Sequence, residues 1–157
     1  DGRNSVGTAF MKITVQNIMF WRKSMLTFTG YGNAPYSLIS RDNCYIRKGS
    51  DTVGYIQGLQ INGSTLSLEH FAVNPDKRGD IKADDMLRGF AKLVKSENSD
   101  IEIITFDLGR ATSDSDIKRL ANAREVLLKR VGAVNVKQTK VNPSRIVVSG
   151  DWHKAMW

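Results

Sequence analysis

The stretch FAVNPDKRGDIKA, residues 71–83, joins two different hydrophobic patterns. Residues 65–73 alternate as a β-strand does, and residues 81–95 repeat their apolar positions with the period of a helix. Arg78 and Gly79 lie at the junction. A helix N-terminus exposes free N–H groups and a partial positive charge. The junction is therefore either an ordinary surface turn or a cradle for an anion.

The composition is that of one soluble globular domain. The chain has 157 residues, of which 41% are hydrophobic and 25% are charged. Its longest apolar stretches fall short of the roughly 20 residues that span a bilayer, so we expect no transmembrane helix. Cys44 is the only cysteine, which excludes an internal disulfide and, with no secretory leader, favours a cytoplasmic protein. We predict a single domain over 11–157, preceded by a polar extension at 1–10.

The net charge of +7 has two interpretations. The basic residues bind an anionic partner, or they only keep the protein soluble. Nucleic acid, a phosphorylated cofactor and an acidic protein are the candidate anions. The basic residues are spread along the chain, and aromatic residues do not interleave with them as a platform for stacking bases requires. Nucleic-acid binding is therefore not the favoured interpretation.

The order of elements predicts an α/β domain with a mixed, mostly antiparallel sheet flanked by helices. An irregular stretch at 21–42 separates a first strand from a three-strand meander, which is followed by helix, strand, helix and a terminal strand pair. The strands are predicted at 11–20, 44–49, 52–61, 65–73, 101–108, 133–138 and 145–149. The Asn62-Gly63 pair predicts a tight hairpin turn within the meander.

Two amphipathic helices follow the junction. The first runs from about Ile81 to Lys95, and its predicted core face consists of Ala83, Leu87, Phe90, Ala91 and Val94. The predicted core face of the second consists of Ile117, Leu120, Ala121, Leu127, Leu128 and Val131. Ser113 or Ser115 can cap its start, and Gly132 can end it.

This order of elements, with a strand ending in Val-x-Pro before a basic-glycine turn, resembles the GNAT superfamily of N-acyltransferases. The resemblance covers residues 44–149, and its most specific part is VNPDKRG at 73–79. In the family, Arg/Gln-x-x-Gly-x-Gly/Ala follows such a strand, and its backbone amides hold the diphosphate of an acyl-coenzyme A. The resemblance therefore implies acetyl-CoA or a related acyl-CoA as co-substrate. The implied binding residues are Phe71, Ala72, Val73, Arg78, Gly79, Asp80, Ile81, Lys82 and Ala83.

The chain departs from the family pattern at two places. Ile81 replaces the middle glycine of the motif, and a β-branched residue tolerates neither positive φ nor crowding well. Asp80, Asp84 and Asp85 also place negative charge beside the expected diphosphate. On the second helix, Leu128 stands where the family often has a tyrosine that can protonate the departing thiolate.

Glu69 and His70 are the candidate catalytic residues, because the family often has a carboxylate or an imidazole on this strand as general base. Uniform alternation would place His70 with Leu66, Leu68 and Ala72 on one face, and Glu69 with Ser67, Phe71 and Val73 on the other. Burial would move either pKa toward neutrality, where a base works best. Each also has a structural interpretation, His70 as a hydrogen-bonded core residue and Glu69 as part of a solvated patch.

The leading hypothesis is an acyl-CoA-dependent N-acyltransferase acting on a small-molecule or protein amine. The alternative is a catalytically inactive GNAT-fold module that uses its basic surface for nucleic acid or an acidic protein. A third possibility is an assembly protein whose tail DWHKAMW, residues 151–157, docks another subunit; core cover is the simpler role for Trp152 and Trp157. Residues 21–42 are expected to shape the acceptor site. One cysteine and two histidines make a zinc site improbable.

Overall fold

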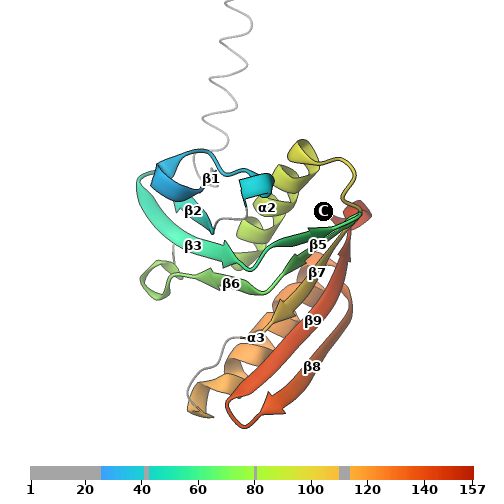
Figure 1. The fold of residues 1–157 in the computed structure, drawn as a ribbon. Coiled ribbons are helices and arrows are strands. Elements are labelled where there is room, and N and C mark those ends of the chain that lie inside the picture. Colours follow the sequence, from blue (N-terminus) through green and yellow to red (C-terminus); the bar gives the residue numbers. More distant parts are fainter. Residues whose placement is uncertain (1–25, 41–42, 80, 110–113) are drawn as a thin grey trace, which may run out of the picture.

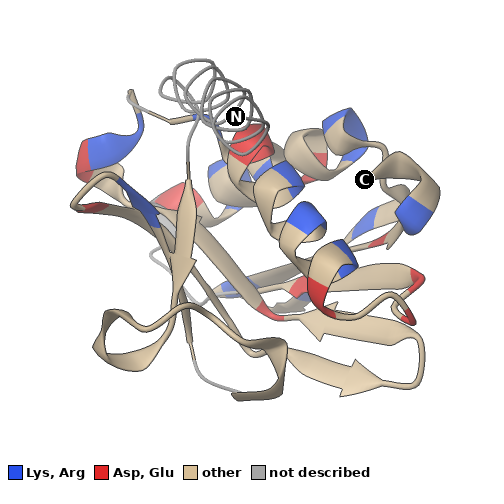
Figure 2. Ribbon diagram, turned by 90° about the horizontal axis from the view of Figure 1, so that it is seen from above, with Lys and Arg blue, Asp and Glu red and all other residues tan. Residues whose placement is uncertain are grey.

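The computed structural model describes residues 26–40, 43–79, 81–109 and 114–157, without the side chains of residues 114 and 115. The strand predicted at 11–20 lies outside the described residues. The described chain forms two β-sheets, and both α-helices lie on the same side of them (Figures 1 and 2). The predicted class, a mixed and mostly antiparallel sheet flanked by helices, is confirmed.

The first sheet has four antiparallel strands in the order β1-β2-β3-β6. They are β1 (Thr27–Thr29), β2 (Cys44–Lys48), β3 (Asp51–Gln57) and β6 (His70–Val73). Between β1 and β2 the described chain forms two 3-10 turns, η1 (Tyr31–Asn33) and η2 (Leu38–Ser40). Strand β6 is the edge of this sheet, so one side of its backbone is paired with β3 and the other is not paired with any described strand.

The second sheet has five strands in the order β4-β5-β7-β9-β8. They are β4 (Gln60–Asn62), β5 (Thr65–Leu68), β7 (Ile103–Leu108), β8 (Val134–Asn142) and β9 (Arg145–His153). Strands β5 and β7 are parallel, as expected for two strands joined through a crossover helix, and the other pairs in this sheet are antiparallel.

The strand predicted at 65–73 is interrupted at Glu69, and the prediction of uniform alternation is wrong beyond that point. Leu66 and Leu68 are buried as expected, but the next buried residue is Phe71, whereas His70 is only half-buried. The interruption shifts the alternation by one residue, because the chain leaves β7 after Leu68 and pairs with β3 instead.

The strand predicted at 52–61 is interrupted at the same level. Strand β3 ends at Gln57 and β4 begins at Gln60, with Gly58 at a φ of +71° between them. A Cβ on Gly58 would lie 2.7 Å from the Cβ of Glu69, closer than side chains approach. Gly58 and Glu69 therefore face each other where the two sheets separate.

The helices are α2 (Ala83–Glu97) and α3 (Asp114–Val131). Helix α2 buries Met86, Leu87, Phe90, Ala91 and Val94, so four of its five predicted core residues are confirmed. Met86 packs where a Cβ on Gly54 would lie, 2.1 Å from its Cε. The absence of a side chain at that glycine lets α2 approach the first sheet closely.

Helix α3 ends as predicted, because Gly132 adopts a φ of +97° and the N–H of Ala133 bonds the Leu128 carbonyl. The C-terminal tail then folds back as a 3-10 turn, η4 (Lys154–Met156). Trp152 is fully buried and donates its indole N–H to the Val131 carbonyl at 2.9 Å. Trp157 donates to the Trp152 carbonyl at 3.1 Å, so both tryptophans cover the core.

Candidate functional site

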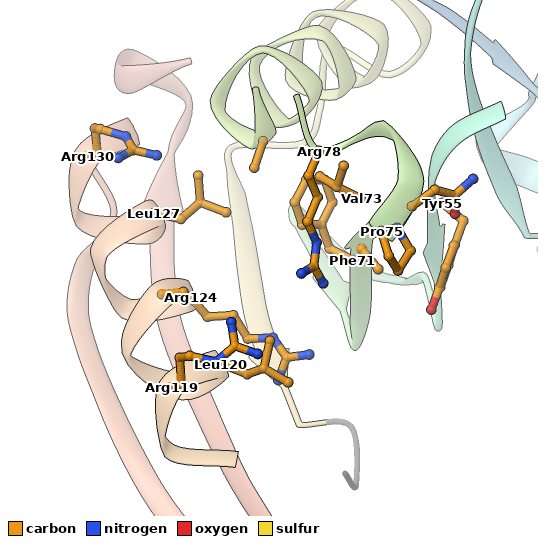
Figure 3. Close-up of a pocket in the computed structure, with 14 residues that line it drawn as sticks. Tyr55, Phe71, Val73, Pro75, Arg78, Arg119, Leu120, Arg124, Leu127 and Arg130 are labelled. Atoms are coloured by element: carbon orange, nitrogen blue, oxygen red, sulfur yellow. The ribbon is translucent and has the colours of Figure 1, made fainter. Parts of the chain in front are cut away.

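A pocket of about 640 Å³ lies between α3 and the strands β3 and β6, next to Tyr55 of β3 and to residues 71–73 of β6 (Figure 3). Its apolar wall comes from Phe71, Val73, Leu120 and Leu127. Tyr55 of β3 also lines it, opposite Ala72 in the strand register. The pocket therefore adjoins the strand β6 that diverges from β7.

The turn after β6 forms one end of the pocket and is held by hydrogen bonds to β3. Asn74 donates its side-chain amide to the Thr52 carbonyl at 2.6 Å and its backbone N–H to the Val53 carbonyl at 2.8 Å. The chain then makes a 3-10 turn, η3 (Pro75–Lys77), with proline at its start. This anchoring fixes where Arg78 enters the pocket.

Four arginines line the pocket, Arg78 from the turn and Arg119, Arg124 and Arg130 from α3. The side chains of Arg78, Arg119 and Arg124 extend from the two walls into the space between them (Figure 3). Arg119 pairs with Asp116 at 3.1 Å, whereas Arg78 forms no hydrogen bond or ion pair with another described residue. Guanidinium groups beside an apolar wall suit a ligand with both phosphates and an apolar arm, and Arg78 is the one of the four without a described partner.

The start of α2 provides backbone N–H groups that have no partner among the described residues. The N–H groups of Ile81, Lys82 and Ala83 donate no hydrogen bond to another described residue, and no side chain caps the helix. Asn33 and Asn135 are the only described non-glycine residues with positive φ, so Ile81 needs no glycine conformation. Its side chain instead packs against the core.

One of the two acidic residues in the first turn of α2, Asp84, is paired. The Arg130 guanidinium donates two hydrogen bonds of 2.5 Å to the carboxylate of Asp84, joining the ends of α3 and α2 at the pocket. The hydrogen bonds from Arg130 are the largest cause of a lowered pKa for Asp84; burial, the next largest, acts in the opposite direction, and the charges of Arg130 and Arg88 and the backbone N–H of Asp84 lower the pKa further. Arg130 thus offsets the negative charge of Asp84, whereas Asp85 in the same turn is exposed and forms no ion pair with a described residue.

The structure brings together part of the predicted donor site. Phe71, Ala72, Val73, Arg78 and Ala83 line the pocket. Gly79 and Lys82 are exposed and Ile81 is half-buried at its margin, while Asp80 lies outside the described residues.

The residues of α3 that line the pocket were not predicted as site residues. Leu120, Ala123, Arg124 and Leu127 form a stripe of helical spacing that faces the pocket, and Leu120, predicted as core, is only half-buried. In the sequence, Arg124 interrupts this otherwise apolar stripe, and that interruption could have indicated a binding site on this face of the helix. Leu128, the position compared with the family tyrosine, is fully buried and does not line the pocket.

Glu69 and His70 lie at the point where the strands diverge, outside the lining of this pocket. Glu69 is exposed, and it packs against Gly58; His70 is half-buried and pairs with Gln57 in the register. Glu69 is therefore not buried, and His70 is buried only in part. Their position relative to β6 still places both near the end of the pocket away from Arg78.

The described residues also bear on the reactivity of the cysteine, on metal binding and on membrane spanning. Cys44 is buried, and burial followed by the negative charge of Glu97 raises its thiol pKa to about 12. The described residues include no group of three or more histidine, cysteine, aspartate or glutamate side chains that could hold a metal ion. They also include no helix long and apolar enough to cross a membrane.

Comparison with solved structures identifies the fold as that of the GNAT acetyltransferases. A GNAT family acetyltransferase from Elizabethkingia anophelis with acetyl-CoA bound superimposes with a TM-score of 0.53 at 10% identity, covering 82% of this chain and 97% of that one. The ribosomal-protein-S18-alanine N-acetyltransferase from Escherichia coli gives 0.52 at 11% identity, over 82% and 94%. The spermidine/spermine N-acetyltransferase SpeG from Vibrio cholerae gives 0.50 at 12%, over 82% and 81%.

These similarities are of fold and not of sequence. No protein-family model matches the chain, and no curated protein sequence matches it. The shared fold gives the class of architecture, and the chemistry must be argued from the residues of this chain.

Proposed function

We propose that this protein is an acyl-CoA-dependent N-acyltransferase that acts on an amine. The observation that carries the proposal is the arginine-lined pocket beside β6, at the strand divergence of a GNAT fold. Such a pocket combines cationic side chains for phosphates with an apolar wall for a pantetheine arm.

The donor is proposed to lie along β6, with its diphosphate at the start of α2. The edge of β6 that faces away from β3 can pair with the amides of the pantetheine arm as an added strand would. Arg78 and the N–H groups of Ile81, Lys82 and Ala83 are the proposed phosphate ligands. The fit is supported by the negative φ of Ile81, because its Cβ and amide need no glycine conformation there.

Glu69 is the proposed general base, and His70 is the second candidate. The base removes a proton from the acceptor ammonium, and the free amine attacks the thioester carbonyl. The new C–N bond forms, the nitrogen loses its second proton to solvent, the C–S bond breaks, and the thiolate takes up a proton. Because Leu128 carries no ionisable proton and is buried, that proton comes from solvent in this scheme.

Isothermal titration calorimetry with acetyl-CoA tests the donor site. We expect saturable binding that Arg78→Gln weakens by about tenfold, since it removes a charged hydrogen-bond donor to phosphate. Lys95→Gln, which removes a positive charge at the other end of α2, is the matched control and should bind as the wild type does. Heat equal to dilution at millimolar acetyl-CoA would remove the proposed function.

A non-catalytic binding module is the second candidate, favoured by the net charge of +7 and by the leucine at position 128. In that case the basic surface would bind an acidic protein or nucleic acid. A titration with single-stranded and duplex DNA at two salt concentrations separates the two, because phosphate-driven binding weakens steeply as salt rises. Salt-sensitive DNA binding together with no response to acetyl-CoA would favour the module.

A further inference from the structure

Asp84 and Arg130 connect the two walls of the pocket. Asp84 is in the first turn of α2, directly after the N–H groups of residues 81–83, and Arg130 is in the last turn of α3. Nε and Nη2 of the guanidinium donate to the two carboxylate oxygens of Asp84 at 2.5 Å each. A bidentate pair of this kind restricts the direction of both side chains as well as their distance. It therefore restricts how the start of α2 lies relative to the end of α3.

The two ends that this ion pair joins are anchored to different sheets. Near the start of α2, the Met86 side chain fills the space that a Cβ on Gly54 of β3, in the first sheet, would take. At the end of α3, the Val131 carbonyl accepts a hydrogen bond of 2.9 Å from the indole of Trp152, on β9 of the second sheet. Beside the pocket, β6 pairs with β3 and β7 pairs with β5 and β9. The ion pair thus bridges parts of the molecule that strand pairing does not join at this level.

The proposed phosphate ligands lie between two side-chain contacts. Asn74, at the start of the turn, donates its side-chain amide to β3 at 2.6 Å, and Asp84 lies just beyond the last proposed ligand. The stretch between them includes Arg78 and the N–H groups of residues 81–83, which have no partner among the described residues. Donors that already have the geometry of the bound state lose less freedom on binding. The two contacts therefore prepare these donors for a common ligand.

Charge alone predicts the opposite role for Asp84. A carboxylate at the start of a helix repels a phosphate bound there, and this one also occupies a guanidinium that lines the pocket. Asparagine at this position would remove the negative charge and release Arg130 for the ligand. On charge alone, Asp84→Asn would bind a polyanion more tightly. A role in holding the two walls predicts weaker binding, so the direction of the change separates the two roles.

We propose that Asp84 is a positioning residue for the acyl-CoA, acting through Arg130 to hold the start of α2 beside α3 so that its N–H groups and Arg78 meet the diphosphate together. This inference rests on the proposed function and adds a residue that does not touch the donor. The side chain of Arg130 is 56% exposed and that of Asp84 is 20% exposed. Water screens a pair of this exposure, so its contribution to binding is that of a surface pair.

Calorimetry with acetyl-CoA on Asp84→Asn tests this role. We expect Kd to rise about three- to fivefold, because the loss cannot exceed what an exposed ion pair contributes. Asp85→Asn is the matched control, since it removes the same charge from the same turn but breaks no described ion pair. It should bind acetyl-CoA as tightly as the wild type or more tightly. Amide NMR spectra of both variants check that the fold is intact.

S-acetylpantetheine lacks the diphosphate and the nucleotide, so it distinguishes positioning from a general disturbance of the pocket. In NMR titrations its affinity should be the same for the wild type and for Asp84→Asn, because the pair is proposed to act on the phosphate donors. Arg130→Gln breaks the same contact from the other side. We expect it to weaken acetyl-CoA binding less in the Asp84→Asn background than in the wild type, as for two residues that act as a unit. A guanidinium that binds the ligand once Asp84 is replaced would give the reverse order.

If Asp84→Asn binds acetyl-CoA as tightly as the wild type, or more tightly, this inference is overturned and the proposed function stands. An equal loss of affinity for S-acetylpantetheine would also overturn it, since the whole pocket would then be disturbed. If the wild type does not bind acetyl-CoA, the proposed function fails and this inference fails with it.

Discussion

Ile81 is the residue at which the sequence departs furthest from the resemblance, and the structure explains how the departure is tolerated. The residue has negative φ and packs its side chain against the core, so its amide stays free of described partners. The sequence could mark the substitution but not its conformation, because φ at a loop residue depends on what packs around it. Arg78, by contrast, could be predicted from the motif alone.

The role of Glu69 leads to a prediction for the chemical step. We expect Glu69→Gln to lower kcat by roughly 10²–10⁴-fold, because glutamine keeps the shape of the side chain but cannot take a proton. The deficit should shrink at high pH, where the acceptor loses its proton without help. Affinity for acetyl-CoA, measured by calorimetry, should not change.

His70→Gln is the comparison for that experiment, since it removes the neighbouring candidate base. If its kcat falls by a larger factor than that of Glu69→Gln, the base is His70 and the assignment of Glu69 is wrong.

Cys44 gives a prediction about reactivity. Because its thiol is buried and burial raises its pKa to about 12, the native protein should not react with Ellman's reagent at pH 8. In 6 M guanidinium chloride the same chain should release one equivalent of the coloured thiolate, since Cys44 is its only cysteine. Rapid reaction of the native protein would show that the first sheet opens at β2.

At the scale of elements, regular patterns were predictable and the places where partners change were not. The buried face of α2 and the end of α3 at Gly132 follow from hydrophobic period and glycine conformation. The break at Glu69 does not, because alternation along 65–73 carries no information about which neighbour each half will pair with. The break also creates the candidate site, because it separates β6 from β7 and leaves β6 to line the pocket.

The link between α2 and α3 through Asp84 and Arg130 gives a prediction about pH. The pKa of Asp84 is lowered in the folded protein, so the pair stabilises the fold above the ordinary aspartate pKa of about 3.9. This contribution is lost as pH falls through the lowered value. The Tm of the wild type should therefore drop more between pH 6 and pH 3 than the Tm of Asp84→Asn.

Asp85→Asn is the matched control for that comparison, because Asp85 is an exposed neighbour in the same helical turn and forms no ion pair with a described residue. Its Tm should follow the pH dependence of the wild type. Identical pH dependence in wild type and Asp84→Asn would show that the pair does not form in solution.

At the scale of the whole molecule, the C-terminal tail closes the core at the end of the second sheet. Trp157 packs on Trp152 with ring centroids 6.4 Å apart and bonds its carbonyl. We expect Trp157→Ala to lower the free energy of unfolding by about 2 kcal/mol, less than for a fully buried tryptophan. Urea unfolding measures this change. If the free energy of unfolding falls by less than the error of that experiment, the tail does not stabilise the core, and docking of a partner becomes the better interpretation.

The charge distribution of the whole molecule could not be predicted from the order of residues. Arg119, Arg124 and Arg130 look in the sequence like the solvent face of a helix. Only the packing of α3 beside β6 brings them to the lining of one pocket.

The central claim is that the pocket between β6 and α3 binds an acyl-CoA, and the amide NMR spectrum during an acetyl-CoA titration tests it most directly. We predict saturable shifts for Phe71, Ala72 and Val73, for Ile81 to Ala83, and for the pocket face of α3, with little change along β8. Saturating acetyl-CoA that leaves β6 and the start of α2 unshifted would contradict the account.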